Sequence, residues 1–518
     1  MRKESLSLRS RREWLKTAGA LGLGAAASTV AMSTAVGEVD AVAVVTAQPR
    51  VLTINHDPQF FVDDYLVDNR WGIEVRSVPV RRIFHPPKKD ERNPIIMEDG
   101  FNGYYLNVVR DDRAGLYRMV YQEYWEISSI HPIKYTYATA YAESTDGIHW
   151  KLPRIGKYMF KDTRDNNIVM LGPSGGAAEC QVLLDLPEEE RHGYQYVMGY
   201  GTLGASGIHL IGSQDGIVWD PASDVPITPP NYNPDHPNSI VWDPQRRKFV
   251  WFTRATNIYS GGDSGPRRRV ARLEHSKLWE KWPVFPENIL IPDELDEKSG
   301  HYYFYGMPTR YHAGIYWGFL WPYAMGLKED IYTELAFSRD GRSFQRFSER
   351  LRLIDLGTGN AWDRGMVLGL ARWVEVGDEW WFYYSGTAGV HDAIDKDRKP
   401  GVGLARLRKE GFVSLRSPDV GGAVVTHPLR WSGGKLYVNA DAGQGELTVR
   451  VTGYDRKPIA NFDPQLSLPV VGNSIRHEVK WKDGDISDLK GQAIRLEFFM
   501  KNIVDLYTFR AVPRGERP

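Results

Sequence analysis

The segment most informative about the architecture reads Ser144-Thr145-Asp146-Gly147-Ile148-His149-Trp150. It recurs as Ser213-Gln214-Asp215-Gly216-Ile217-Val218-Trp219 and again as Ser338-Arg339-Asp340-Gly341-Arg342-Ser343-Phe344. A degenerate copy pairs Ser276 with Trp282, which are also six residues apart. The four serines are separated by 69, 63 and 62 residues, so the chain repeats one structural unit.

Each copy describes the end of a strand, a tight turn and the return of the chain. Asp-Gly favours such a turn because Gly adopts positive φ and Asp accepts hydrogen bonds from nearby backbone. The aromatic residue then packs from the next strand. A weaker fifth copy spans Gly403–Phe412. A period of about 65 residues suits a four-stranded blade with long loops, so five copies predict an all-β, five-bladed β-propeller.

The repeat stops near residue 420, where Gly421-Gly422 begins a segment of different rhythm. Short alternating runs at 435–439, 445–451, 477–481, 493–498 and 506–509 predict a small antiparallel β-sandwich. We therefore expect three parts: a signal peptide at 1–47, the propeller at 48–420 and the sandwich at 421–518. No long amphipathic helix is expected after the signal.

The N-terminus predicts export of a folded protein. Ser10–Lys16 contains Arg11-Arg12, with Trp14 at the usual place of Phe in a twin-arginine signal, and an apolar run follows at Ala18–Ala27. No later segment has the roughly 18 apolar residues that a membrane span needs. We expect cleavage near residue 43 or 47 and a soluble periplasmic or secreted protein that does not bind a membrane.

The amino-acid composition limits the class of molecule that the protein is expected to bind. Lys+Arg and Asp+Glu are both 65, so bulk charge does not attract the chain to nucleic acid or an anionic membrane. The single cysteine, Cys180, excludes an internal disulfide and a cysteine-rich zinc site. Trp (17) and Tyr (27) are abundant, and such rings fill propeller cores and also stack on sugars. A carbohydrate is the expected partner, while the oligomeric state stays open.

Polar residues at the start of the innermost strands are expected to point into the central pocket of a propeller. Hydrolysis of a glycosidic bond needs two carboxyl groups, one as proton donor and one as nucleophile or base. We predict Asp99, Glu179 and Asp235 as this catalytic set, with Asp363 in reserve. The structural alternative is that Asp99 is a loop residue, while Asp235 and Asp363 only cap turns.

Further polar and aromatic residues are predicted to hold the substrate. They are Glu98, His236, Arg254, Arg310, His312, Glu334, Trp362 and Arg364. An arginine binds a carboxylate through two parallel hydrogen bonds, which admits uronic acids or sulfated sugars as substrates. The alternative for each is a surface salt bridge. No metal-ligand motif, Walker loop or dinucleotide fingerprint occurs. We expect no required cofactor, and a structural calcium ion on loop oxygens stays open.

Several motifs resemble a known group of proteins. They are Phe61–Val67, Glu334–Gly341, Phe382–Gly386 and Leu436–Asp441. These motifs resemble exported bacterial, fructosidase-like glycosyl hydrolases related to family 32, over essentially the whole mature chain. The wider set comprises five-bladed propeller glycosidases such as invertases and arabinanases. This resemblance implies a propeller, in invertases with a C-terminal sandwich, and three acids from separate blades around the cleaved bond.

The resemblance implies a role for one acidic residue, Glu179, while the motifs that contain the other two acids of the family are missing here. Glu179-Cys180 resembles the Glu-Cys pair that bears the acid, although it falls in the second blade rather than the third. The Trp-Met-Asn-Asp-Pro-Asn-Gly and Arg-Asp-Pro motifs are missing. We predict a glycoside hydrolase of a poly- or oligosaccharide. A polysaccharide lyase with a Tyr or His base and a non-catalytic glycan-binding propeller are the alternatives.

Overall fold

The computed structural model describes residues 50–72, 80–98, 101–126, 135–171, 177–202, 207–228, 237–254, 268–283, 286–391 and 399–516. The predicted signal peptide and the site candidates Asp99, Asp235 and His236 lie outside the described residues. Among the residues described, no helix has the length and apolar character to cross a membrane.

Five antiparallel sheets follow one another along the chain, as the repeat predicts. The first two consist of β6 (Gly103–Asp111), β7 (Leu116–Glu126), β8 (Tyr135–Ser144) and β9 (Ile168–Met170), then β10 (Ala177–Val182), β11 (Tyr196–Thr202), β12 (Ile208–Ser213) and β13 (Trp219–Pro226). The third consists of β14 (Ser239–Asp243), β15 (Lys248–Arg254), β16 (Val270–His275) and β17 (Glu287–Leu290). Each is one propeller blade.

The fourth blade is more irregular and the fifth closes the ring. The fourth contains β18 (Tyr303–Gly306), β19 (Thr309–His312), β20 (Ile315–Tyr323), β21 (Thr333–Ser338), β22 (Gln345–Arg346) and β23 (Arg352–Ile354), with helix α1 (Glu294–Ser299) preceding it. The fifth contains β24 (Met366–Val376), β25 (Glu379–Thr387) and β26 (Pro400–Arg408). Its outermost strand is β5 (Lys88–Lys89), which comes from the N-terminal side of the propeller and pairs with Ala405 and Arg406.

The repeated turns have one geometry. The Ser144 hydroxyl accepts a hydrogen bond from Gly147 N at 2.9 Å, and Asp146 Oδ1 accepts from the two following backbone N–H groups. The same bonds recur at Ser213/Asp215 and Ser338/Asp340. The turn glycines have φ of 69–75°, a conformation that L side chains rarely adopt. The motif is therefore a structural element of the blade.

All five blades contribute residues to one small cavity, which shows that they are arranged radially around a common axis. Its walls come from the first strand of every blade, or from residues next to that strand. The lining includes Tyr105 and Asn107, Glu179–Gln181, Asn238 and Ser239, Thr309 and Leu370–Arg372. A second cavity continues along the same strands and shares Gln181, Thr309, Ala371 and Arg372 with the first.

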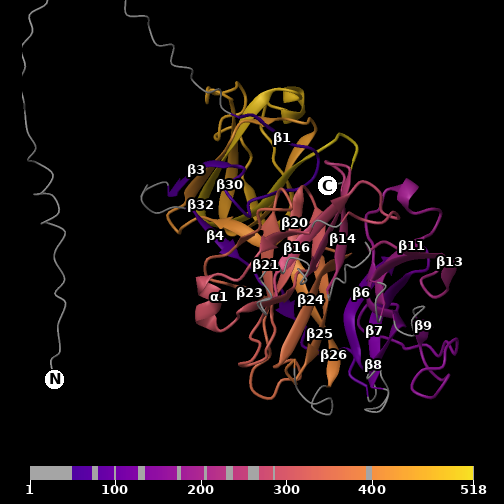
Figure 1. Ribbon diagram of the computed structural model, residues 1–518. Helices are drawn as coiled ribbons and strands as arrows, with labels where there is room; N and C mark the ends of the chain where they lie inside the picture. The colour runs from indigo at the N-terminus through magenta and orange to yellow at the C-terminus, as the bar shows by residue number, and fades with distance from the viewer. Residues whose placement is uncertain are drawn as a thin grey trace, which may run out of the picture. The chain divides into compact units, whose positions relative to one another are not determined.

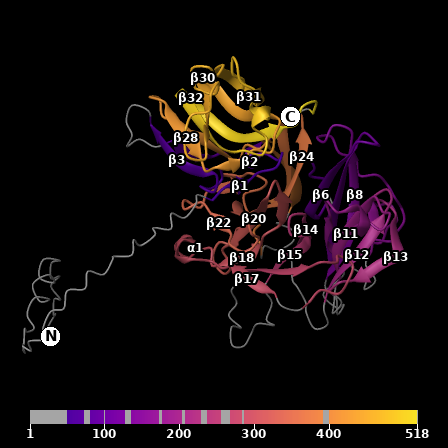
Figure 2. The same ribbon diagram turned by 90° about the horizontal axis from the view of Figure 1, so that it is seen from above.

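The remaining sheet joins both ends of the chain. It contains β1 (Leu52–Thr53), β2 (Gln59–Phe60), β3 (Val67–Gly72), β4 (Arg81–Phe84), β27 (Val413–Arg416), β28 (Gly422–Thr426), β29 (Leu429–Arg430), β30 (Lys435–Gly453), β31 (Val470–Glu478) and β32 (Ala493–Val512). Figures 1 and 2 show the indigo N-terminal strands among the yellow C-terminal ones. The expected boundaries need correction, because residues 52–84 and 413–416 pair within this sheet.

Two long strands account for another difference from the sequence. The segments 435–439 and 445–451 form one strand, β30, and 493–498 and 506–509 form one strand, β32. Register shifts near Asn439 and Asp441 let β30 bend without ending. The polar, glycine-containing stretch between its two halves is thus a bulge rather than a loop.

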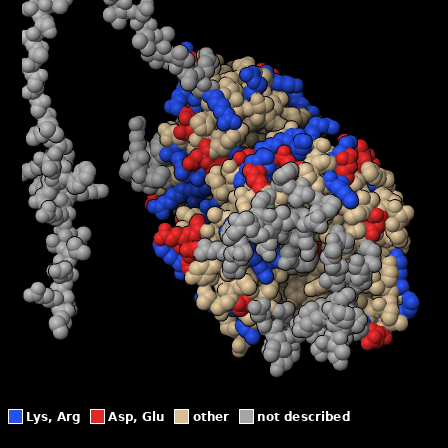
Figure 3. Space-filling model, in the orientation of Figure 1, with Lys and Arg blue, Asp and Glu red and all other residues tan. Residues whose placement is uncertain are grey.

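Surface charge agrees with the balanced composition. On the face in Figure 3, acidic and basic side chains are interspersed. Among the described residues of this face, side chains of both signs lie next to one another, so neither sign dominates.

Candidate functional site

The axial pocket is shaped by bulges in the first strands of neighbouring blades. The pairing of β6 with β7 shifts register between Tyr104 and Asn107, and that of β10 with β11 shifts between Ala178 and Gln181. At these bulges Tyr105 and Glu179 both have φ of 53°, which is unusual for residues with side chains. Both side chains line the pocket. Backbone strain of this kind is frequent at functional sites.

Glu179 is held in this pocket by polar contacts from two other blades. Its side chain is buried, with the residue 4% exposed, and its backbone N donates to Gln122 Oε1 at 2.8 Å. Asn238 Nδ2 donates to Glu179 Oε2 at 2.7 Å. The amide of Asn238 is itself oriented, because its Oδ1 accepts from Trp251 Nε1 and Thr253 Oγ1 at 2.9 and 2.7 Å. The donor edge of Asn238 is therefore directed to the carboxylate.

Arg254 ends β15 beside this carboxylate and is also buried. Burial and the neighbouring Arg268 lower the pKa of Arg254 to about 10, against the opposite effect of Tyr305, Tyr105 and Glu179. Burial raises the pKa of Tyr105 well above its usual value, and Tyr305 and Glu179 add to the effect. These mutual effects group residues from the first four blades into one cluster.

An aromatic wall continues the cluster toward the fifth blade. The Arg268 guanidinium lies 5.0 Å from the Tyr305 ring centroid and 5.4 Å from that of Tyr323. His391 packs on both tyrosines, at 5.1 and 4.9 Å between ring centroids. The fully buried Trp321 packs against Tyr105 and Tyr305, with about 6 Å between ring centroids. Arg268 is thus pinned against a rigid surface.

Two of the predicted site residues, Glu179 and Arg254, come together in this cluster. Arg310 and His312 lie farther along the first strands, where Arg310 lines the second cavity. The Arg310 guanidinium lies 4.3 Å from the Trp373 ring centroid and 3.6 Å from Asp185. Burial, with a smaller effect of Arg310, lowers the pKa of His312 to about 3. Arg310 thus lines the second cavity and not the one that Glu179 lines, and the assignment of Arg310 and His312 as substrate-binding residues stays a prediction.

Asp363 is directed along its blade and away from the axis. Lys89 Nζ on β5 and Tyr384 OH on β25 donate to its Oδ2 at 2.6 and 2.9 Å. These partners belong to the outermost and second strands of the fifth blade, whereas β24 is the innermost. Trp362 stacks on Tyr384 at 5.8 Å. The contacts of Asp363 are those of a residue that ties the closing strand to the blade.

The remaining acidic and basic candidates among the described residues do not line the axial cavity. Glu334 accepts two 2.7 Å hydrogen bonds from Arg346, which also binds Asp296 through both terminal nitrogens. This buried ion-pair network joins α1 to the outer strands of the fourth blade, so Glu334 does not line the axial cavity. Glu98 and Arg364 are exposed, and Arg364 donates only to Ala361 O among the described contacts.

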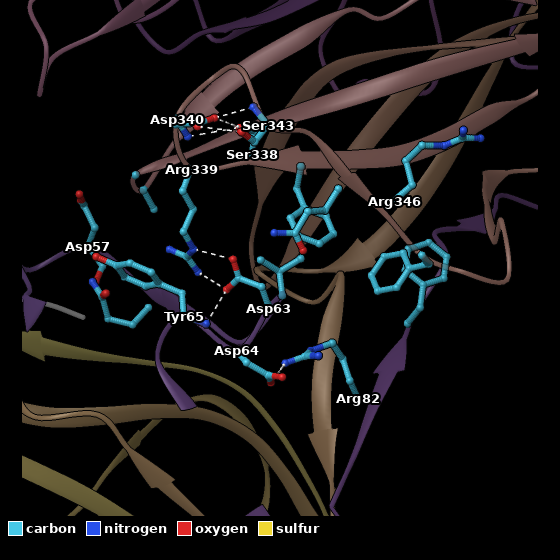
Figure 4. A pocket seen from close by; sticks show the side chains of 18 of the residues that line it. Asp57, Asp63, Asp64, Tyr65, Arg82, Ser338, Arg339, Asp340, Ser343 and Arg346 are labelled. Atoms are coloured by element: carbon cyan, nitrogen blue, oxygen red, sulfur yellow. Dashed lines mark hydrogen bonds and ion pairs between the residues drawn. The ribbon is translucent and has the colours of Figure 1, made fainter. Parts of the chain in front are cut away.

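A larger groove lies between the sandwich and the turns of the third and fourth blades. It has a volume of about 1370 Å³ and is lined by β-turn residues such as Gln245 and Asp340 together with residues 50–65. Its charges pair with one another: Arg339 binds both oxygens of Asp63 at 2.8 Å, and Arg82 binds Asp64 at 2.6 Å (Figure 4). We interpret these contacts as the junction between propeller and sandwich.

Sequence reasoning missed Tyr105, Arg268, Tyr305 and His391. Tyr105 lies inside a predicted strand, and alternation gives no sign of a bulge that turns it to the axis. Arg268 had a signal in the run Arg267-Arg268-Arg269 before a predicted strand. This run of three basic residues is the one sequence feature that sets Arg268 apart.

Among the described residues, no group of three or more His, Cys, Asp or Glu side chains is arranged to hold a metal ion. The expectation of an optional calcium ion therefore has no candidate set among those residue types in the described part.

No family model matches the chain, and no curated protein matches it. Solved structures with a similar course of the chain include a family 43 arabinoxylan arabinofuranohydrolase from Bacillus subtilis, at 11% identity over 82% of this chain and 97% of that one, with a TM-score of 0.38. A β-1,2-mannobiose phosphorylase from Listeria innocua is 11% identical over 62% and 96%, with a TM-score of 0.44.

An N-acetylgalactosamine deacetylase from F. plautii is 14% identical over 63% of this chain and 95% of that one, with a TM-score of 0.40. At such identities and TM-scores we base the functional proposal on the pocket's own residues.

Proposed function

We propose that the protein is a glycoside hydrolase that binds a sugar at the Glu179 end of the small axial cavity and whose Glu179 exchanges a proton with the glycosidic oxygen. The observation that carries this proposal is the buried Glu179 carboxylate, which lines the axial cavity and is oriented by Asn238 at 2.7 Å. Cleavage of a glycosidic bond by two carboxyl groups requires such a positioned acid.

The second carboxyl group is proposed to be Asp99 or Asp235. Both precede the first strand of a blade, whereas Glu179 lies within the first strand of its blade, at the bulge of β10. The resemblance to propeller glycosidases, with acids from separate blades, supports this choice. We do not extend fructan specificity to this chain, because the nucleophile motif of invertases is missing.

Replacement of Glu179 by Gln tests the proposal. We expect kcat on a natural glycan to fall about 10²- to 10⁴-fold, because general acid–base catalysis contributes about that much. Glu188→Gln, an exposed residue of the same blade, is the matched control and should keep wild-type turnover. The substrate is found by screening the mature protein against a glycan panel with product identification. A Glu179→Gln variant that turns over normally removes Glu179 from the mechanism.

A polysaccharide lyase is the alternative, because the cluster contains tyrosines beside arginines. In such an enzyme a tyrosine removes a proton from the uronate while an arginine neutralises its carboxylate. Burial raises the pKa of Tyr105 well above its usual value, so its phenolate is scarce near neutral pH and Tyr105 is a poor base. Hydrolysis is therefore the better proposal. Ultraviolet absorbance of an unsaturated uronate in the product would establish β-elimination instead.

Hydrolysis by two carboxyl groups needs no metal, so we propose that no cofactor is required. EDTA is then expected to leave turnover unchanged. Loss of activity with EDTA that calcium restores would assign a calcium ion to the protein.

A further inference from the structure

We propose that the second axial cavity holds a chloride ion between the guanidinium groups of Arg310 and Arg372. This cavity lies farther along the first strands than the one that Glu179 lines, and residues of the second to fifth blades form its walls. The inference concerns a different cavity from the proposed hydrolytic site and does not depend on that function.

Two buried donors at this cavity lack an acceptor. Arg372 Nη2 donates to the backbone oxygen of Val182, whereas Arg372 Nη1 is buried and has no hydrogen-bond partner among the described residues. Arg310 Nη1 donates to the backbone oxygen of Trp373 at 3.2 Å, and Arg310 Nε is buried without a partner in the described part of the chain. Buried donors of this kind are rare in folded proteins. An anion between the two guanidinium groups supplies the missing acceptor.

The charges at this cavity favour an anion over a neutral occupant. Its charged lining residues are Arg310, Arg372 and Asp185. Asp185 Oδ2 lies 3.6 Å from Arg310 Nη2, which is longer than a hydrogen bond, and the Asp185 side chain is 65% exposed, so water screens its charge. Glu375 also acts on Arg310, but its carboxylate accepts from Lys409 Nζ at 2.6 Å. Two guanidinium groups therefore share one exposed carboxylate.

Arg310 also destabilises the charged form of Arg372. Burial, followed by the effect of Arg310, lowers the pKa of Arg372 to about 9, although Asp185 opposes this shift. Glu179 lines the neighbouring cavity, where its carboxylate accepts from Asn238 Nδ2 at 2.7 Å. Two buried like charges are costly unless a counter-charge lies beside them, so a bound anion stabilises the arrangement.

The size of the cavity selects a monatomic ion. The cavity has a volume of about 20 Å³, and roughly 10–15 Å³ is enough for one water molecule. A chloride ion is only slightly larger than water, whereas sulfate and phosphate bring several further atoms. The Arg310 guanidinium is held in place for this contact, because it lies 4.3 Å from the Trp373 ring centroid.

The first experiment uses bromide in place of chloride, because anomalous X-ray scattering identifies bromide. Crystals of the wild-type mature chain are soaked in sodium bromide, and data are collected at the bromine absorption edge. We expect an anomalous peak between Arg310 and Arg372, within hydrogen-bond distance of both guanidinium groups. Electron density of a water molecule at this place, without an anomalous signal, overturns the inference.

The second experiment measures the effect of chloride in solution. The melting temperature of the mature chain is followed while sodium chloride replaces sodium gluconate at constant ionic strength. We expect a saturating rise, of about 2–3 °C when chloride reaches about 100 times its Kd. Arg372→Gln and Arg310→Gln should abolish the rise. Arg247→Gln removes a positive charge from an exposed turn and should leave the rise unchanged.

Arg372→Lys separates loss of the ion site from loss of the fold, since it keeps the charge and should keep part of the chloride effect. An equal rise in Arg372→Gln, or no difference between chloride and gluconate for the wild type, overturns the inference. A bromide peak without any chloride effect in solution also overturns it, because the ion then binds at crystal concentration only. None of these results depends on whether the protein cleaves a glycan.

Discussion

Glu179 and Glu334 are both buried carboxylates, yet their partners give them different chemistry. Glu334 accepts both its strong hydrogen bonds from a guanidinium that also holds Asp296, and it lies in the outer part of its blade. Glu179 has an amide donor, Asn238, and lines a cavity. A carboxylate that must give and take a proton is better served by the second environment.

Asn238 is expected to act as a positioning residue. Asn238→Ala removes the donor to Glu179 Oε2, which disfavours the ionised carboxylate. We expect kcat to fall about 10-fold and, because Glu179 is the proposed proton donor, the alkaline limb of the kcat pH profile to move to higher pH. An Asn238→Ala protein with lower kcat and an unmoved pH profile would show that the amide only supports the fold.

At the scale of elements, blade closure depends on β5 and the ion pair between Lys89 and Asp363. Asp363→Asn should lower the free energy of unfolding by about 2 kcal/mol, because a buried partner of an ion pair is removed. Turnover of the folded protein should stay at the wild-type level. Urea unfolding and kinetics on the same sample check both. Lost kcat with unchanged stability would return Asp363 to the catalytic set predicted from sequence.

The repeated turns predict how stability depends on pH. Burial opposes ionisation of Asp340, yet the backbone N–H groups of Ser343 and Arg342 outweigh it and lower its pKa to about 2. The pKa values of Asp146 and Asp215 are also lowered, by similar contacts that outweigh burial. Because the folded pKa lies below the unfolded one, this stabilisation is present above about pH 4 and is lost toward pH 2.

Replacing the three turn aspartates by Asn should therefore reduce the loss of stability that the protein shows as the pH falls. The difference in urea midpoint between wild type and this triple variant is expected to shrink steadily as pH falls from about 5 to 2. A difference that is constant over this range would mean that the turn carboxylates do not change their ionisation between folded and unfolded protein.

At the scale of the whole molecule, the fold joins distant ends of the chain. Residues 52–84 pair with strands after 413, and β5 pairs with β26. The last sheet and the last blade can form only when the whole chain is present. This requirement agrees with the proposed export of a folded protein through the twin-arginine route.

Arg11→Lys combined with Arg12→Lys is expected to stop that export in a host that has the twin-arginine pathway. The protein should then accumulate, folded, in the cytoplasm, because the paired arginines are the recognised address. Cell fractionation and immunoblotting measure the distribution. Undiminished amounts of the double variant outside the cytoplasm would reject this route.

The sequence by itself determined the propeller, its five repeats and the turns between strands, because these depend on local preferences of Ser, Asp, Gly and aromatic residues. It also pointed to Glu179 and Arg254. Only the tertiary structure decided that the N-terminal strands join the last sheet and that Asp363 and Glu334 face away from the axis. Strand pairing and bulges depend on contacts between residues hundreds of positions apart, which alternation along the chain does not encode.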